Sequence, residues 1–239
     1  MIFKPKNKSK IKLDIKIGDK ALTESEEITF LGVIVDNKLN FSSHFKKVYE
    51  KIKKGLNGLI MVKNQLSYRA KLNVYHGLIH SHLSYCALIW ISNLTKKQQK
   101  MLKTVQKKAM RLIFSVKYNA HTDSLFERSK ITKVENIFEK ESLLMTFKYQ
   151  NKTLPSAIMK LFDNSLYSNN IITRKQTSCD LRPKKELKIG NLMYEILDSW
   201  NKIGIPFRNE KTLKGFKNRI TSLQNRYVEC DKINCYSCA

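Results

Sequence analysis

Residues 44–60 read HFKKVYEKIKKGLNGLI, and the spacing of their apolar side chains predicts an amphipathic helix. The apolar positions recur every three or four residues, at Phe45, Val48, Tyr49, Ile52, Leu56, Leu59 and Ile60. The opposite face carries Lys46, Lys47, Lys51, Lys53 and Lys54. Ser42 and Ser43 precede the pattern and suit the N-cap, where a hydroxyl accepts a bond from a backbone N–H. We therefore expect a helix with one buried face and one basic face.

Two further helices are expected after this one. Residues 69–90 are apolar almost all round, which predicts the most buried helix of the set. A third helix is expected from Thr95, as its N-cap, to Phe114. Its expected core positions are Met101, Leu102, Val105, Ala109, Leu112 and Ile113. Because the connections between the three are short, we expect an antiparallel bundle.

Helical spacing continues towards the C-terminus. Apolar residues from Val134 to Met145 outline a fourth helix, and Leu154-Pro155 opens a fifth, because proline suits the first helical turn. Residues 163–188 show no periodicity and are expected to form a loop. Two more helices are expected, at about residues 190–202 and 210–227.

The first 36 residues have β character instead. Residues 11–17 alternate between apolar and polar side chains, which predicts a half-buried strand. ITFLGVIVD at 28–36 is a continuous apolar run of strand type, in which Gly32 is expected to mark a bulge or a close backbone approach. The predicted fold class is therefore mostly α. Its expected parts are a short N-terminal β-hairpin unit (1–36), a basic helical bundle (37–122) and a further helical region (123–239).

The net charge of the chain predicts a polyanionic partner. Lys and Arg number 45 against 20 Asp and Glu, a formal net charge of +25, whereas small soluble domains carry a charge of about 2–8. Such a surface repels itself unless it meets a polyanion. Nucleic acid is the first expected partner and an anionic membrane surface the second, and a small-molecule substrate is not expected. The hydrophobic content of 42% excludes wholesale disorder.

The sequence also bears on the compartment. The first ten residues, MIFKPKNKSK, lack the apolar segment of a secretion signal, and five cysteines make an odd count. We therefore expect a reducing, intracellular environment. Residues 72–95 contain no charged side chain apart from histidines. Their three histidines and two asparagines are costly in lipid, which favours a buried helix over a membrane span.

The positive charge is concentrated in the predicted bundle. Residues 37–122 hold 17 Lys and Arg against one acid, Glu50, a local net charge of +16. Five basic residues recur at helical spacing on one face of the third helix: Lys96, Lys100, Lys103, Lys107 and Arg111. No acid lies between residues 96 and 117. A like-charge stripe destabilises an isolated helix, so we expect phosphates opposite it, and a plain solvated helix face is the alternative.

Several motifs, in this order, resemble a known family. They are MIFKP (1–5), FLGVIVDNKLNFSSHF (30–45), KIKK (51–54), LIHSHLSYCALIW (78–90), QKKAMRLIF (106–114) and HTDSLF (121–126). The chain resembles the part of non-LTR (LINE-type, jockey-like) retrotransposon reverse transcriptases that follows the catalytic motif. The resemblance covers nearly the whole chain and rests on the order and spacing of the motifs rather than on any one of them.

The resemblance implies a role for each segment. Phe30, Leu31 and Gly32 match the primer-grip hairpin that holds the primer end, and residues 37–122 match the thumb, which lies on the template–primer duplex. Residues 123–239 match the helical C-terminal region. The implied nucleic-acid-binding residues are Lys46, Lys47, Lys51, Lys54, Lys96, Lys100, Lys103, Lys107, Lys108 and Arg111. They are expected to contact backbone phosphates, which position a duplex without reading its sequence. A nuclear location or a cytoplasmic ribonucleoprotein is implied.

The family's catalytic motif is missing from the sequence. Its polymerases need an Asp-Asp pair and another palm aspartate to hold two Mg²⁺ ions, and this chain contains no Asp-Asp. The expectation is a fragment that binds nucleic acid, has no catalytic residues and no cofactor of its own, and is not an enzyme by itself. The Mg²⁺ would belong to the missing palm. Alternatives are a stand-alone or domesticated basic helical nucleic-acid-binding protein and a peripheral membrane protein. The sequence sets no oligomeric state.

Two groups of residues have side chains that commonly ligate metals. Cys230, Cys235 and Cys238 offer three thiols near the C-terminus, whereas a structural zinc site needs four ligands, so tail thiols compete with a zinc knuckle. His76 and His80 have the spacing of a metalloprotease pair, but residue 77 is glycine where the general-base glutamate would stand. Packing or hydrogen bonding inside the bundle is the preferred role for these histidines.

Overall fold

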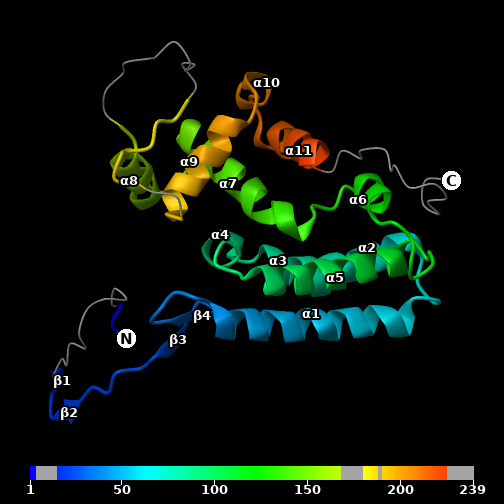
Figure 1. Cartoon of the computed structure of the whole chain (residues 1–239), viewed down its shortest axis with the longest axis horizontal. Helices are drawn as coiled ribbons and strands as arrows, with labels where there is room; N and C mark the ends of the chain where they lie inside the picture. Colours follow the sequence, from blue (N-terminus) through cyan, green and yellow to red (C-terminus); the bar gives the residue numbers. More distant parts are fainter. Residues whose placement is uncertain (4–14, 168–179, 188–189, 225–239) are drawn as a thin grey trace.

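The structure is a computed structural model that describes residues 1–3, 15–167, 180–187 and 190–224. It confirms a mostly α fold with short antiparallel strand pairs at the N-terminus (Figure 1). The strands are β1 (Lys16–Ile17), β2 (Lys20–Ala21), β3 (Glu27–Phe30) and β4 (Val33–Asp36). The helices up to the bundle's end are α1 (Ser42–Val62), α2 (Tyr68–Tyr75), the π-helix η1 (His76–His80), α3 (Ser81–Ser84), α4 (Ala87–Trp90) and α5 (Lys96–Ile113). The later helices are α6 (Asp123–Ser129), α7 (Val134–Gln150), α8 (Ser156–Ser165), α9 (Leu192–Lys202), α10 (Ile205–Arg208) and α11 (Leu213–Gln224).

The segment ITFLGVIVD forms a hairpin rather than one strand. β3 and β4 pair in antiparallel register, with Phe30 opposite Val33, so Leu31 and Gly32 make a two-residue turn. Both have positive φ, 45° and 82°, which is the backbone of a type I′ turn. The expected bulge at Gly32 is therefore wrong, because the left-handed conformation serves the chain reversal.

The strand expected at residues 11–17 is only partly within the described residues. β1 and β2 form a second small hairpin around Gly18. The side chain of Ile15 is 50% exposed and that of Ile17 is 69% exposed, so the expected half-buried face is not formed there. Two strands of two residues cannot cover an apolar face, and no other described element packs on them closely enough to do so.

Helix α1 confirms the opening prediction. Its buried residues include Phe45, Val48, Ile52, Leu56 and Leu59, whereas Ile60 is exposed. Phe41, not a serine, occupies the N-cap, and its left-handed backbone is held because its N–H donates to a carboxylate oxygen of Asp36 at 2.7 Å. Asp36 thus joins the end of β4 to the start of α1.

The single long helix expected at residues 69–90 is broken into four pieces. The π-helix interrupts it first, and the extended Tyr85 and left-handed Cys86 interrupt it again before α4. The Trp90 indole N–H donates to the Tyr85 carbonyl at 2.9 Å, which satisfies a carbonyl that the break leaves without a helical partner. Leu78 and Ile89 are exposed, so this segment is also less buried than expected.

Helix α5 begins as predicted at the Thr95 N-cap, with a full capping box between Thr95 and Gln98. α1 and α5 lie alongside each other, and the segment α2–α4 runs back in the opposite direction against both (Figure 1). A close approach of α1 to η1 requires Gly55, because a Cβ there would lie 2.6 Å from the Leu78 carbonyl oxygen. Together α1, the segment α2–α4 and α5 form the bundle.

The C-terminal region packs over the bundle through α7. The main core extends from Val33 to Ile137, and two further clusters join the later part of α7 to α8, α9 and α11. α8 extends to Ser165, where the sequence predicts a loop, and Leu166 then bridges to Pro183. The helices expected at 190–202 and 210–227 correspond to α9 and α11, with the short α10 between them. The segment boundaries at residues 36 and 122 stay predictions.

Candidate nucleic-acid interface

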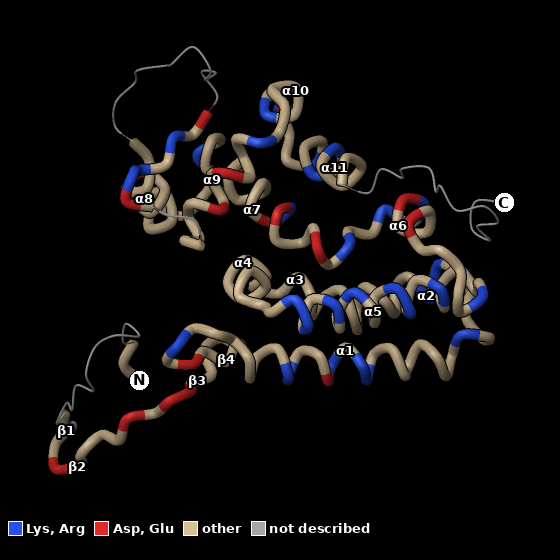
Figure 2. Tube along the Cα trace, in the orientation of Figure 1, with Lys and Arg blue, Asp and Glu red and all other residues tan. Residues whose placement is uncertain are grey.

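The candidate interface is the exposed basic face of α5 and α1. α5 buries Leu102, Val105, Ala109, Met110 and Ile113 against the bundle, so its lysines are left on the opposite side. Figure 2 shows basic residues along both α5 and the neighbouring α1. The helices carry one acid between them, Glu50. The structure therefore places the predicted lysines on two helices that pack against each other.

Six basic residues of α5, the five of the stripe and Lys108, divide into two rows by their exposure. Lys96 and Lys100 are exposed, as is Lys108 beside them, and none of the three has an ion pair with a described carboxylate. We call these three residues the outer row. Lys103, Lys107 and Arg111 are half-buried and face the α6–α7 segment. We call them the inner row.

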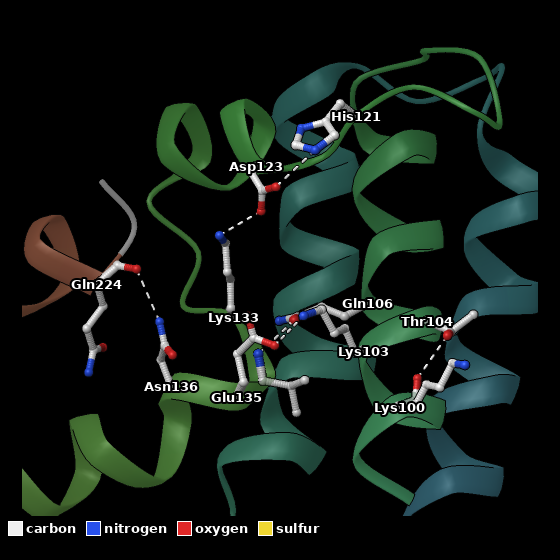
Figure 3. Close-up of polar contacts among 11 residues, drawn as sticks. Lys100, Lys103, Thr104, Gln106, His121, Asp123, Lys133, Glu135, Asn136 and Gln224 are labelled. Carbon is white, nitrogen blue, oxygen red and sulfur yellow. Dashed lines mark hydrogen bonds and ion pairs between the residues drawn. The ribbon is translucent and has the colours of Figure 1, made fainter. Parts of the chain in front are cut away.

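The inner row is engaged within the chain. Lys103 Nζ lies 2.6 Å from Glu135 Oε2 of α7 (Figure 3). Arg111 Nε donates to the Ala120 carbonyl at 2.9 Å. Lys107 lines a small cavity together with Asp123. The sequence predicted that all five residues of the stripe face phosphates. Because an ammonium that already pairs with a carboxylate gains less from a phosphate, we expect the outer row to contribute more to phosphate binding than the inner row.

Asp123 lies among basic side chains at the edge of the inner row. It lies 2.7 Å from Lys133 Nζ and 3.3 Å from His121 Nε2 (Figure 3). Burial would raise the pKa of Asp123, but the bond and charge of Lys133, with the charges of His121 and Lys107, lower it overall. Asp123 and Glu135 thus neutralise part of the bundle's charge at the α5–α6–α7 junction and leave the outer row exposed.

Lysines surround the exposed half of α1. Lys46, Lys47, Lys51 and Lys54 are exposed, and Lys53 pairs with Glu50 at 3.2 Å while lying 5.7 Å from the Tyr49 ring centre. Lys51 and Lys47 also lower the pKa of the nearby His44, although burial is the larger cause.

The predicted primer-grip residues lie at the end of the basic face where α1 begins. Phe30 is 63% and Leu31 is 73% exposed, at the tip of the β3–β4 hairpin. Tyr85, from the break between α3 and α4, donates its hydroxyl to the Leu31 carbonyl at 2.5 Å. Gly32 packs beside the Tyr85 ring, where a Cβ would still fit at 3.8 Å, so its positive φ rather than space requires glycine.

The hairpin is fixed to the first turn of α1. Ile34 N–H donates to His44 Nδ1 at 3.3 Å, and Ser43 donates its hydroxyl to the Glu27 carboxylate. The lowered pKa of His44 keeps its imidazole neutral, which allows Nδ1 to accept that bond. A fixed hairpin can hold its exposed tip at a set position relative to the lysines of α1.

Sequence reasoning missed Gln106, which organises the junction behind the interface. Its buried side-chain amide donates to the Tyr75 hydroxyl and to the Thr132 carbonyl, both at 2.9 Å. Its carbonyl oxygen accepts from Val134 N–H at 2.8 Å, which caps the start of α7. The only sequence signal is that a polar residue stands three positions before Ala109, at a core position of the α5 pattern.

The other candidates have mixed outcomes. Cys230, Cys235 and Cys238 lie outside the described residues. Within the described residues, no group of three or more His, Cys, Asp or Glu could hold a metal ion. His76 and His80 are neighbours, with ring centres 5.4 Å apart. No helix in the described part of the chain has the length and apolar character needed to cross a membrane.

The comparisons with known proteins give no relative. No family model matches the sequence, and neither the curated proteins nor the solved structures gave a significant match.

Proposed function

We propose that this chain binds nucleic acid through backbone phosphates, as the primer-grip, thumb and C-terminal part of a non-LTR retrotransposon reverse transcriptase. The observation that carries the binding proposal is the outer row of α5 beside the lysines of α1, on a surface with one acid. Phosphate contacts with lysine supply affinity that is independent of base sequence. The proposed family rests in addition on the order of the motifs and on the exposed hairpin tip at Phe30–Gly32. An intracellular location is part of the same proposal.

The arrangement also suits a duplex rather than a small anion. α5 has 18 residues and α1 has 21, so at 1.5 Å per residue they extend for about 27 and about 32 Å. Each length spans several phosphates of one strand. Salt should therefore weaken the complex with a slope set by many contacts.

The experiment replaces the outer row, Lys96, Lys100 and Lys108, by glutamine and titrates a labelled DNA template–primer duplex at several salt concentrations. Each lost phosphate contact should lower the slope by about 0.9 for a B-form duplex, so the triple variant should lose roughly 2–3. The affinity should fall at least about tenfold at low salt.

The matched control replaces Lys148, Lys152 and Lys160 by glutamine. These exposed lysines lie on the C-terminal region, away from α5, and the change in net charge is the same. Equal effects of the two triple variants would show that net charge, not the α5 surface, drives binding. Stronger binding of anionic liposomes than of the duplex would favour a membrane partner instead.

A further inference from the structure

A second basic site lies between η1 and the C-terminal region. It is a pocket of about 420 Å³, a volume typical of a small-ligand site. Its lining comes from η1, the α6–α7 connection, α7 and α11, and includes no residue of α1 or α5. The lining residues are His76, His80, Lys130, Ile131, Thr132, Lys140, Lys217, Asn218, Thr221 and Ser222.

The charge of this pocket has one sign. Lys130, Lys140 and Lys217 line it, and none of the lining residues that the structure describes is acidic. Lys140 Nζ donates to Thr132 Oγ1 at 2.8 Å. Burial lowers the pKa of Lys140, and the charge of Lys217 lowers it further, although Glu141 acts in the opposite direction. An ammonium that is partly desolvated beside another ammonium destabilises the empty pocket, and a bound anion would relieve this.

The two histidines add neutral hydrogen-bond donors. They are the first and last residues of the π-helix, a geometry found often at functional sites. Burial, followed by the charges of His76, Lys140 and Lys217, lowers the pKa of His80 to about 4. Burial and Lys140 also lower the pKa of His76. A neutral imidazole carries one N–H, and both rings line the pocket, so each can offer a donor without adding charge.

We propose that this pocket binds a phosphate-bearing anion, with Lys130, Lys140 and Lys217 as the charged ligands and His76 and His80 as neutral donors. Three ammonium groups match the charge of a di- or triphosphate, and charge-assisted bonds to phosphate oxygens are the strong class of hydrogen bond. The hydroxyl of Ser222 and the amide of Asn218 line the same pocket and add uncharged donors. The site is separate from the α5 surface, so it does not rest on the proposed duplex binding.

The test measures binding of inorganic tripolyphosphate to the full chain by calorimetry, with ATP as a second arm. Tripolyphosphate should bind with saturation, and Lys217→Gln should weaken it at least about tenfold, as expected for loss of one charge-assisted contact. Lys217 is exposed, so this variant keeps the fold. Lys140→Gln should have the same effect and, without tripolyphosphate, should unfold at the same temperature as the wild type or a higher one.

The control is Lys100→Gln on the outer row of α5, which should change tripolyphosphate affinity less than twofold. Equal affinity for ATP would assign recognition to the phosphate chain, and tighter ATP binding would add a nucleoside contact to it. Either result supports a phosphate site. Unsaturable binding, or equal weakening by Lys217→Gln and Lys100→Gln, would overturn the proposal, because it would reduce binding to general attraction by a basic chain.

Discussion

Lys103 of α5 and Glu135 of α7 form an ion pair, with Nζ 2.6 Å from Oε2, that joins the basic helix to the C-terminal region (Figure 3). Both side chains remain nearly half exposed, at 44% and 45%. The pair therefore removes one lysine from the predicted phosphate-facing stripe without being buried. It also distinguishes Lys103, which has an ion-pair partner within the chain, from the outer-row lysines, which are exposed and available to a partner.

The first prediction concerns the contribution of this ion pair to the free energy of unfolding. Lys103→Ala should lower the free energy of unfolding by about 0.2–1 kcal/mol, the range for exposed ion pairs. Its effect on duplex affinity should be smaller than that of Lys100→Ala, because Lys103 already has a partner. A double-mutant cycle with Glu135→Ala, followed by denaturant unfolding, isolates the pair. A larger loss of duplex affinity from Lys103→Ala than from Lys100→Ala would contradict the division into two rows.

The second prediction concerns Gln106. Replacing it with alanine leaves Val134 N–H, the Tyr75 hydroxyl and the Thr132 carbonyl without their partner. Because each orphaned buried group costs about 1–3 kcal/mol, the variant should lose at least about 2 kcal/mol of unfolding free energy. Chemical denaturation measures this loss. Lys108→Ala on the exposed side of the same helix is the control and should change stability by less than about 0.5 kcal/mol.

The third prediction concerns the β3–β4 turn. Leu31 has a φ of 45°, which is costly for leucine, whereas asparagine adopts this region readily. Leu31→Asn should therefore raise the unfolding temperature. Gly32→Ala should lower the free energy of unfolding by about 1 kcal/mol, because its φ of 82° is unfavourable for a Cβ. Thermal unfolding of both variants tests the turn, and the opposite order of stability would rule out the type I′ backbone.

The helical pattern predicted most of the fold because periodicity reports a buried face directly. The stripe of α1 and the Thr95 N-cap were both legible in the sequence, since each depends on residues within a few positions of one another. The breaks at His76–His80 and Tyr85–Cys86 were not. The break at Tyr85–Cys86 depends on contacts such as the Trp90 indole N–H to the Tyr85 carbonyl and the Tyr85 hydroxyl to the Leu31 carbonyl. A uniformly apolar segment has no periodicity from which to read a break.

The interface shows the same limit. The spacing of Lys96, Lys100, Lys103, Lys107 and Arg111 predicted a shared face. The partners Glu135 and Ala120 come from later parts of the chain, so spacing could not divide this face into an outer and an inner row. The pocket at His76 and His80 was also hidden, because Lys130 and Lys140 lie fifty or more residues further along the chain and Lys217 comes from a third, still later segment.

The fourth prediction is that the chain alone does not extend a primer. A polymerase needs close carboxylates to hold two Mg²⁺ ions, and the sequence contains no Asp-Asp. Incubation of the purified chain with template–primer, deoxynucleotides and Mg²⁺ should give no product above a buffer control. Binding of the same duplex, measured in parallel, shows that the protein is folded and loaded. Extension that depends on the chain would contradict this prediction.

The fifth prediction concerns His80 and acid pH. Its pKa is about 4 in the folded chain, lowered by burial and by the charges of His76, Lys140 and Lys217, against about 6.5 when unfolded. Between these values the unfolded state binds a proton that the folded state does not. His80 therefore lowers stability as the pH falls from about 6.5 to about 4, by about 3 kcal/mol in all, and contributes no further change below that.

The unfolded His80→Gln variant has no imidazole to take up this proton, so its stability should fall less than that of the wild type over the same pH range. Denaturant unfolding at half-unit pH steps gives the difference curve, which cancels the titration of the carboxylates common to both. His82→Gln, two residues further along the helix, is the control. Burial and the charge of Lys51 lower its pKa too, but its ring is more exposed, so its difference curve should be shallower. Parallel curves for His80→Gln and the wild type would show that His80 is solvated in the folded chain. The phosphate pocket would then lose its buried neutral donor.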